Sequence, residues 1–318
     1  MVGLGVGCIG GDDGVTLLAY TTPREVYEEV IPAFRDTPAA AGVPVRQSYG
    51  PSGDQSRAAE NGLQADVLAL ALAPDIDRLV DDGIVAADWD QGPTDGFVST
   101  SVVVLAVREG NPKDIRDWDD LLRDDVEVVT PNPLSSGGAQ WNVAAIYGAE
   151  LVRGGSHEDA LSHLAAVFDN VVVQPKGSRE ALQVFSAGKG DVLVAYESEA
   201  VIARQKGEAV DYVVPDQTVL IQHPIAVSAE AADPLAARAF VDYALSEPAQ
   251  EVFARKGYRS VLPEVAARHA GAYPVPPGLF TVDGTLGGWE RFRADFFGPD
   301  GHMNRIFGGQ ELFPGDDR

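Results

Sequence analysis

The stretch TPNPLSSGGAQWN spans residues 130–142 and follows the short, mostly apolar run VEVV at residues 126–129. A strand-like run, a turn rich in serine and glycine, and a helical pattern together form the junction of a β–α unit. The stretch has no acidic side chain, although the chain carries a formal net charge of −24. The first N–H groups of a helix are unpaired, and glycine lets a ligand approach them closely. The junction is therefore suited to an anion; a capped helix after a tight turn is the alternative.

The same alternation of strand and helix continues along most of the chain. Helical segments dominate after Glu230. Strands are expected at 15–20, 43–49, 66–73, 98–107, 126–130, 170–174, 191–196, 211–215 and 218–228. Helices are expected at 23–34, 52–63, 75–83, 115–122, 139–152 and 178–187, and a further helix is expected to begin at Glu197. This order predicts an α/β fold in which parallel sheets carry helices on both faces.

The spacing of these elements predicts two lobes with a cleft between them. The chain is expected to cross between the lobes near 105–112 and again near 215–222. In open α/β sheets, ligands bind beyond the carboxyl ends of the strands, and GPSGDQ and SSGGAQW both lie at such ends. The predicted division is a signal remnant or linker at 1–14, lobe 1 at 15–107 and 219–275, lobe 2 at 108–218, and a C-terminal segment packing on the lobes at 276–318.

Composition argues against several classes of function. Aspartate and glutamate number 48 against 24 lysines and arginines, and the basic stripe that a nucleic-acid-binding protein needs is not visible. No apolar run reaches the ~18 residues of a membrane span. The acidic residues occur in scattered pairs typical of a solvated surface, which would also suit a protein working in high salt.

Motifs for catalysis and metal binding are not apparent either. The five histidines show no metal-ligand spacing, and no Gly-x-Ser-x-Gly motif is present. Paired carboxylates such as Glu197 and Glu199 fit solvated or capping positions. A transcription factor would need a helix-turn-helix, for which the residues before Val15 are too few. We therefore expect no enzyme, no cofactor, no metal and no nucleic-acid partner.

Cys8 is the only cysteine, which excludes an internal disulfide. It lies in LGVGCIGGDDG, where small residues precede the cysteine and a flexible polar stretch follows. This resembles the end of a lipoprotein signal, although the leucine lies four residues before the cysteine rather than three, and no basic residue precedes it. Two interpretations stay open: Cys8 is lipidated, or the segment is an N-terminal remnant.

Several motifs in order along the chain resemble those of one family. Besides TPNPLSSGGAQWN they are ADVLALALAPDID, VREGNPKDIRDWDDLL, GDVLVAYESEA, GYRS and LFTVDGTLGGWERF, and they cover the chain from about Thr16 to Phe307. Together they resemble the substrate-binding proteins of sulfate and thiosulfate ABC transporters. The resemblance implies a two-lobed, hinged periplasmic binding protein of the second type, with a mainly parallel sheet and helices on both faces in each lobe.

The resemblance also implies a set of residues that hold sulfate without cationic side chains. By motif these are Thr21, Ser52, Ser136, Gly137, Gly138, Ser178 and Tyr196. Ser52 would supply a hydroxyl from lobe 1, and Ser178 a backbone N–H from lobe 2. Trp289 is expected to pack in the C-terminal segment rather than to touch the ligand.

Three positions depart from the family pattern. Thr21 replaces an aspartate whose contact is made by the backbone, Gln140 replaces a common arginine, and Tyr196 replaces a tryptophan. An indole can only donate a hydrogen bond, whereas a phenol can donate or accept, so the exchange at Tyr196 leaves the identity of the anion open. Without a ligand role, Tyr196 would be a core aromatic and Thr21 a turn residue.

The function implied by the resemblance is capture of sulfate and its delivery to a membrane ABC permease with its ATPase subunit. The protein would be an extracytoplasmic monomer, periplasmic or at the cell surface, with Cys8 as its candidate lipid anchor. Thiosulfate, molybdate and tungstate are the alternative ligands. An enzyme on the same two-lobed fold is the alternative of a different class.

Overall fold

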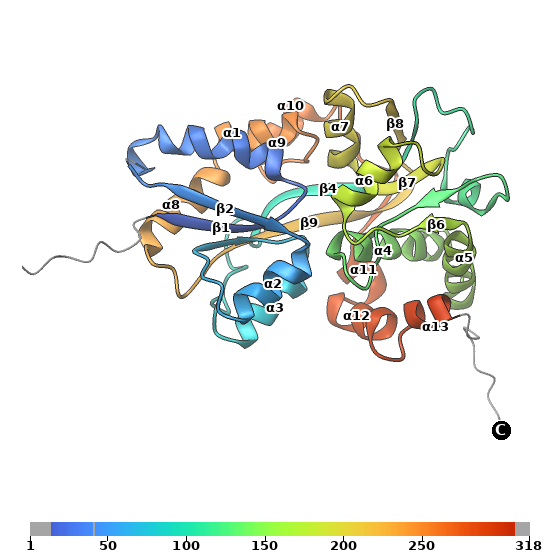
Figure 1. Cartoon of the computed structure of the whole chain (residues 1–318), viewed down its shortest axis with the longest axis horizontal. Coiled ribbons are helices and arrows are strands. Elements are labelled where there is room, and N and C mark those ends of the chain that lie inside the picture. The colour runs from blue at the N-terminus through green and yellow to red at the C-terminus, as the bar shows by residue number, and fades with distance from the viewer. Residues whose placement is uncertain (1–13, 41, 309–318) are drawn as a thin grey trace, which may run out of the picture.

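The computed structural model describes residues 14–40 and 42–308, and the predicted lipidation site Cys8 lies outside them. The molecule is elongated, with two lobes side by side along its long axis (Figure 1). A ten-stranded sheet runs through both lobes in the order β2-β1-β3-β9-β4-β7-β5-β6, with β10 beside β9 and β8 beside β4. The predicted two-lobed α/β architecture is confirmed.

Lobe 1, on the left in Figure 1, is built on three parallel strands with helices on both sides. Its strands are β1 (Val15–Tyr20), β2 (Val45–Gly50) and β3 (Val67–Ala69). Its helices are α1 (Arg24–Arg35), α2 (Ser52–Glu60), α3 (Ala73–Asp81), α8 (Pro234–Ala244), α9 (Glu247–Arg255) and α10 (Pro263–His269), with a short 3-10 helix η1 (Pro38–Ala40) after α1. In α1, residues Val26, Val30 and Phe34 recur at helical spacing and are fully buried, which fixes the face that packs on the core.

Lobe 2, on the right, repeats the arrangement around β5, with β6 and β7 parallel to it on either side. Its strands are β5 (Val128–Val129), β6 (Val171–Val173), β7 (Val192–Tyr196) and β8 (Val210–Val213). Its helices are α4 (Gly137–Val152), α5 (His157–Asp169), α6 (Ser178–Ser186) and α7 (Glu197–Gln205). Both β7 and α4 are almost wholly buried, whereas the turn before α4 exposes Leu134.

Two long strands, β4 (Phe97–Arg108) and β9 (Gln217–Val227), join the lobes. The first half of β4 pairs with β9, up to Val102 opposite Leu220. Its second half pairs with β7 and β8, beginning with Val103 opposite Tyr196. These pairings are antiparallel, as is that of β9 with β3, whereas the alternation of elements predicted parallel sheets. The chain passes from lobe 1 to lobe 2 along one strand and returns along the other, so the two strands must run in opposite directions. The alternation of strands and helices in the sequence does not reveal this.

Local elements also differ from the prediction. The helix α5 was not expected, although Ser156 and Asp159 form the capping box that starts it. The strand expected at 66–73 is shorter, β3 (Val67–Ala69), because α3 begins at Ala73. The helix expected at 115–122 is a short 3-10 helix, η2 (Trp118–Leu122).

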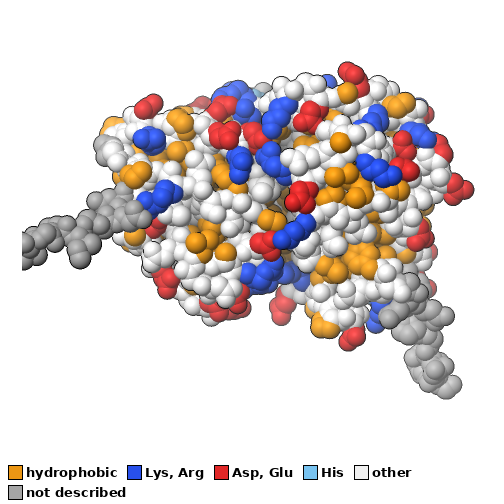
Figure 2. All heavy atoms as spheres, in the orientation of Figure 1, with side chains coloured by type: hydrophobic (Ala, Val, Ile, Leu, Met, Phe, Trp, Pro, Cys, Tyr) orange, Lys and Arg blue, Asp and Glu red, His pale blue; other side chains and the backbone are white. Residues whose placement is uncertain are grey.

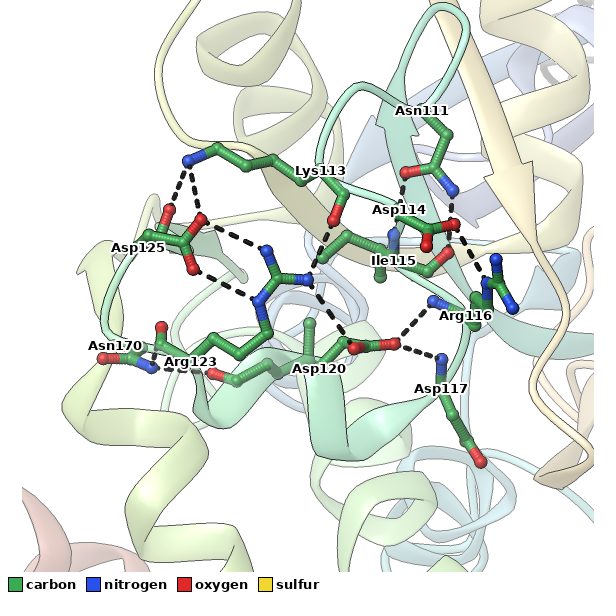
Figure 3. A network of polar contacts seen from close by, with 11 residues as sticks. Asn111, Lys113, Asp114, Ile115, Arg116, Asp117, Asp120, Arg123, Asp125 and Asn170 are labelled. Carbon is green, nitrogen blue, oxygen red and sulfur yellow. Dashed lines mark hydrogen bonds and ion pairs between the residues drawn. The ribbon is translucent and has the colours of Figure 1, made fainter.

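The motif VREGNPKDIRDWDDLL forms a self-supporting loop around η2 (Figure 3). The Asp120 carboxylate accepts the N–H groups of Arg116 and Asp117 at 2.7 and 3.2 Å. Arg123 donates to the Lys113 carbonyl at 2.8 Å and forms an ion pair with Asp125 at 3.1 Å. These contacts hold together the loop between β4 and β5. This motif of the resemblance therefore has a structural role in the loop.

The C-terminal segment packs on α4 of lobe 2 through β10 (Gly278–Phe280) and the helices α11 (Val282–Leu286), α12 (Trp289–Phe297) and α13 (His302–Gly308). Trp289 packs edge-to-face on Trp141 of α4, with ring centroids 4.5 Å apart. Gly148 of α4 lies directly against the Phe280 ring, where a methyl group would overlap two ring carbons.

We predict that Gly148→Ala destabilises the protein although alanine favours helix. Helix propensity would stabilise the folded state by about 1 kcal/mol, whereas overpacking costs about 1–3 kcal/mol. Urea unfolding of Gly148→Ala, Phe280→Leu and the double variant measures the balance. Leucine lacks the ring carbons that the added methyl group would overlap. The double variant should therefore lose less unfolding free energy than the sum of the losses in the two single variants. Additive losses would contradict the proposed contact.

Candidate anion-binding site

The starts of three helices meet where the two lobes face each other. A methyl group on Gly137, the first residue of α4, would lie 3.3 Å from Ser52 Cβ at the start of α2 and 3.2 Å from Leu72 Cδ1. Gly137 belongs to lobe 2, whereas Ser52 and Leu72 belong to lobe 1. We call this contact surface between the lobes the seam. The predicted second-lobe junction and the predicted first-lobe serine therefore do come together.

Gly138 is the centre of a second group, which lies within lobe 2. A methyl group at Gly138 would overlap Ser178 Oγ and lie 3.5 Å from both Ser136 Oγ and the Tyr196 hydroxyl. Ser178 begins α6, and Tyr196 ends β7. Three residues predicted from separate motifs thus converge on one glycine. Only glycine leaves room beside the Ser178 hydroxyl.

Several backbone N–H groups at the seam and around Gly138 lack hydrogen-bond partners. Among residues 14–40 and 42–308, no hydrogen bond engages the N–H groups of the following residues, which stand at helix starts: Ser52, Gly137, Gly138 and Ser178. Helix starts expose such N–H groups together with the positive end of the helix dipole. The arrangement therefore offers hydrogen-bond donors to an acceptor-rich anion.

The hydroxyl groups at the site divide into free and engaged ones. The Tyr196 hydroxyl is buried and, within the described part of the chain, has no hydrogen-bond partner. Burial raises its pKa well above the ordinary value, so it stays protonated at neutral pH. Ser136 caps α4 and accepts the Ala139 N–H at 3.4 Å, which leaves its own hydrogen available.

Ser52 differs from its predicted role as a simple donor. Its hydroxyl donates to Asp75 Oδ2 at 2.6 Å and accepts the Ala71 N–H at 2.9 Å. The Trp141 indole of lobe 2 donates to the Ala71 carbonyl at 2.9 Å across the seam. A buried hydrogen-bond chain thus connects α4 to Ser52 and Asp75. No sequence motif indicated these hydrogen bonds, because Asp75 fits an ordinary first-turn position of α3.

The seam also carries ion pairs that were not predicted. The Glu25 carboxylate of lobe 1 accepts hydrogen bonds from Nη1 and Nη2 of Arg179 of lobe 2, at 3.0 and 2.8 Å. It also forms an ion pair with Lys206. Arg179 also donates to the Thr21 carbonyl at 3.3 Å, so Thr21 lies beside a residue from the other lobe. Burial opposes ionisation of Glu25, but hydrogen bonds from Arg179 and Lys206 outweigh it and lower the pKa to about 2.

A second ion pair joins the lobes between Lys176 and Asp54, at 3.2 Å. Lys176 and Arg179 flank the predicted contact Ser178, and Asp54 lies two residues after Ser52. Figure 2 shows basic and acidic side chains intermixed near the middle of this face. These cations at the seam are paired with carboxylates, which leaves backbone and hydroxyl groups as the donors at the site.

The wall behind Tyr196 is aromatic and uncharged. His223 of β9 is fully buried, and its ring centroid lies 5.4–5.6 Å from those of Tyr20, Tyr196 and Tyr258. Burial lowers the His223 pKa to about 3, so the ring is neutral at physiological pH, with Nδ1 3.0 Å from Ser99 Oγ. The sequence placed His223 among ordinary histidines and did not show that it backs the site.

Other features of the described surface do not compete with this site. A groove of about 640 Å³ beside α11–α13 is lined by Asp283, Asp295, Arg291 and His302 among others, and so mixes donors with acids. In the described ranges, no cluster of three His, Cys, Asp or Glu side chains is arranged to hold a metal ion. No helix among these residues is long and apolar enough to cross a bilayer.

Comparison with known proteins gives a consistent result. Residues 15–259 match the family model of the bacterial extracellular solute-binding proteins. A sulfate-binding protein of Synechococcus elongatus is 41% identical over 301 residues, covering 92% of this chain and 86% of the relative. A thiosulfate-binding protein of Escherichia coli is 31% identical over 303 residues, covering 91% and 89%.

A solved structure agrees with the sequence relatives. The sulfate-binding protein SubI from Mycobacterium tuberculosis superposes with a TM-score of 0.85 at 44% identity, over 87% of this chain and 97% of that chain. The periplasmic binding protein AfuA from Actinobacillus pleuropneumoniae, at 17% identity and a TM-score of 0.66, shares the fold. The chain belongs to the bacterial extracellular solute-binding protein family.

Proposed function

We propose that this protein captures sulfate between its two lobes and delivers it to an ABC permease. The observation that carries the proposal is the group of unpaired N–H and O–H donors around Gly137, Gly138, Ser178 and Tyr196. Sulfate is fully ionised at neutral pH and offers only acceptors, which such a group can satisfy. The names of the relatives and of the matching solved structure support the same ligand.

The proposal includes how the parts work together. Lobe 1 (15–107 and 219–275) and lobe 2 (108–218) close on the ligand, with the C-terminal segment (276–318) packed on the lobes. Ser52 and Thr21 approach from lobe 1, and the remaining predicted contacts come from lobe 2. The protein acts outside the cytoplasm as a monomer, with lipidated Cys8 as its proposed anchor, and performs no catalysis.

Thiosulfate is the second candidate ligand, because thiosulfate-binding relatives match nearly the whole chain. Molybdate and tungstate are also fully ionised tetrahedral dianions and would use the same donors. Titration calorimetry with all four anions ranks them, and turnover of none of them is expected. Failure of all four to bind would contradict the proposed function.

We predict that sulfate shifts the protein toward a closed form. The full donor set assembles only when Gly137 meets Ser52 across the seam, so binding favours closure. Small-angle scattering of the full chain should show a smaller radius of gyration at saturating sulfate than in sulfate-free buffer. An unchanged profile in protein that binds sulfate calorimetrically would contradict a site shared between the lobes.

Gly137→Ala should weaken sulfate binding without weakening the lobes themselves. The added methyl presses on Ser52 and Leu72 only when the lobes are closed. Overpacking by one methyl costs about 1–3 kcal/mol, which corresponds to roughly a 5- to 150-fold rise in Kd. Thermal unfolding without ligand should stay close to wild type. Gly271→Ala, with no heavy atom near the added methyl, is the matched control and should bind normally.

The donor-only site should reject phosphate, which carries a proton at neutral pH. That proton would face another donor, and sites that enforce such matching discriminate by about 10⁴. Tyr196 is the exception, because its oxygen can accept a hydrogen bond. We predict tighter binding of sulfate than phosphate by wild type, and a larger ratio of the two Kd values in Tyr196→Phe. Competition titrations of both proteins with both anions measure the ratios.

Two results would contradict this selectivity model. Equal affinities of wild type for the two anions would show that the site contains an effective acceptor. A ratio that falls in Tyr196→Phe would show that the phenol contributes more to sulfate binding, as a donor, than to phosphate binding. Since the hydroxyl has no other partner in the described chain, its loss should leave thermal stability nearly unchanged.

A further inference from the structure

Trp141 lies where α4 of lobe 2 meets the segment between β3 and α3 of lobe 1. Its side chain is 1% exposed and packs edge-to-face on Trp289, with ring centroids 4.5 Å apart. The indole N–H, which is the only polar group of the side chain, donates to the Ala71 carbonyl at 2.9 Å. Ala71 is equally buried, and both residues belong to one apolar cluster that spans the seam. A hydrogen bond in such surroundings is stronger than one in water.

The Trp141 hydrogen bond is linked to the residue that presents the backbone donor of lobe 1. The Ala71 N–H donates to Ser52 Oγ at 2.9 Å, and the Ser52 hydroxyl donates to Asp75 Oδ2 at 2.6 Å. The Ser52 side chain is thus engaged by the scaffold, whereas its backbone N–H at the start of α2 has no partner in the described chain. Trp141 can therefore hold the start of α2 in place through the Ala71 peptide group.

The ion pairs that join the lobes differ from this hydrogen bond in their exposure to water. The side chains of Lys176 and Asp54 are 63% and 37% exposed, and those of Arg179 and Glu25 are 31% and 13% exposed. Ion pairs that water reaches are screened by salt and contribute little to stability. The indole hydrogen bond is neutral and buried, so salt does not screen it. Removal of the indole N–H in the closed form would leave a buried carbonyl without a donor.

We propose that Trp141 is a positioning residue for sulfate binding, whose indole N–H bonds to the Ala71 carbonyl across the closed seam, holds the start of α2 over the anion and slows release of the ligand. When the lobes separate, the indole and the carbonyl each face water and find partners there. The hydrogen bond therefore favours the closed form over the open form. This inference rests on the proposed function and deepens it.

The first experiment removes the indole N–H with Trp141→Phe, which keeps an aromatic ring at this position. An unpaired carbonyl in the closed form corresponds to a roughly 5- to 150-fold rise in Kd for sulfate. The change should lie in the dissociation rate, because the ligand enters the open form, in which the bond is absent. Titration calorimetry of the full chain with sodium sulfate gives Kd. Release of radiolabelled sulfate into excess unlabelled sulfate gives the dissociation rate.

Trp118→Phe is the matched control. Trp118 is also fully buried, and its indole donates to the Gln217 carbonyl at 2.8 Å, but this bond lies within lobe 2. The control removes the same group from the same residue type, so it should lower thermal stability and leave both Kd and the dissociation rate unchanged. Added sodium chloride should not change the ratio of Kd between Trp141→Phe and wild type, since a neutral hydrogen bond is not screened.

Hydrogen exchange of the indole N–H groups tests the same inference in wild type. In sulfate-free buffer, the Trp141 indole N–H should exchange faster than that of Trp118, because lobe opening exposes the first and not the second. Saturating sulfate should remove most of this difference by keeping the lobes closed. Nuclear magnetic resonance of isotope-labelled full chain measures both rates.

The outcomes separate the two proposals. If wild type does not bind sulfate, the proposed function fails and this inference fails with it. If wild type binds sulfate and folded Trp141→Phe has the same Kd and dissociation rate, this inference alone fails. It also fails if Trp118→Phe weakens binding as strongly, because the effect then follows from the loss of any buried indole. Should Trp141→Phe not fold, the exchange measurement decides: equal exchange of the two indole N–H groups in sulfate-free buffer overturns the inference.

Discussion

Unpaired N–H groups at the starts of helices are the constraint on which this structure depends. Buried backbone donors normally find partners, because an unpaired one costs about 1–3 kcal/mol. Here several of them, at Gly137, Gly138 and Ser178, stand together without partners in the described chain. A ligand that accepts hydrogen bonds removes that cost. The helices and strands of both lobes are arranged so that these groups meet.

The contacts that join the two lobes lie near the segments that hold the donors. The strands β4 and β9 carry the chain between the lobes, and through them one sheet continues across both lobes. Around the site, Trp141 of lobe 2 bonds to Ala71 of lobe 1, and Arg179 beside Ser178 bonds to Glu25. Arg179 is adjacent in sequence to Ser178, and Trp141 lies three residues after Gly138, so these two contacts between the lobes lie close in sequence to predicted ligand contacts.

Electrostatics explains why neutral donors suit this protein. A chain with a net charge of −24 repels an anion at long range, and the cations near the seam are already paired with carboxylates. Helix starts provide partial positive charge that needs no counter-ion. Their N–H groups only donate hydrogen bonds, so they favour a ligand that carries no proton. The neutral His223 and the protonated Tyr196 behind the site keep its wall uncharged.

Periodicity and ordered motifs were sufficient to predict much of the local structure and the candidate residues. Strand and helix periodicity located β1, β7, β9 and α4, and the acid-free Ser-Gly turn before α4 indicated an anion. Ordered motifs then supplied the set from Thr21 to Tyr196, whose ligand role stays a proposal. These features depend on neighbours within a few residues, so a single sequence can show them.

Tertiary structure alone decided the relations between distant residues. Only folding brings Asp75 against Ser52, 23 positions away, or Trp141 against Ala71, 70 positions away. The antiparallel crossings of β4 and β9 depend on the path of the whole chain, which periodicity does not record. The hydrogen of Ser52 illustrates the difference: its residue type was evident from a motif, but the direction in which it donates depends on a partner that only the folded chain places beside it.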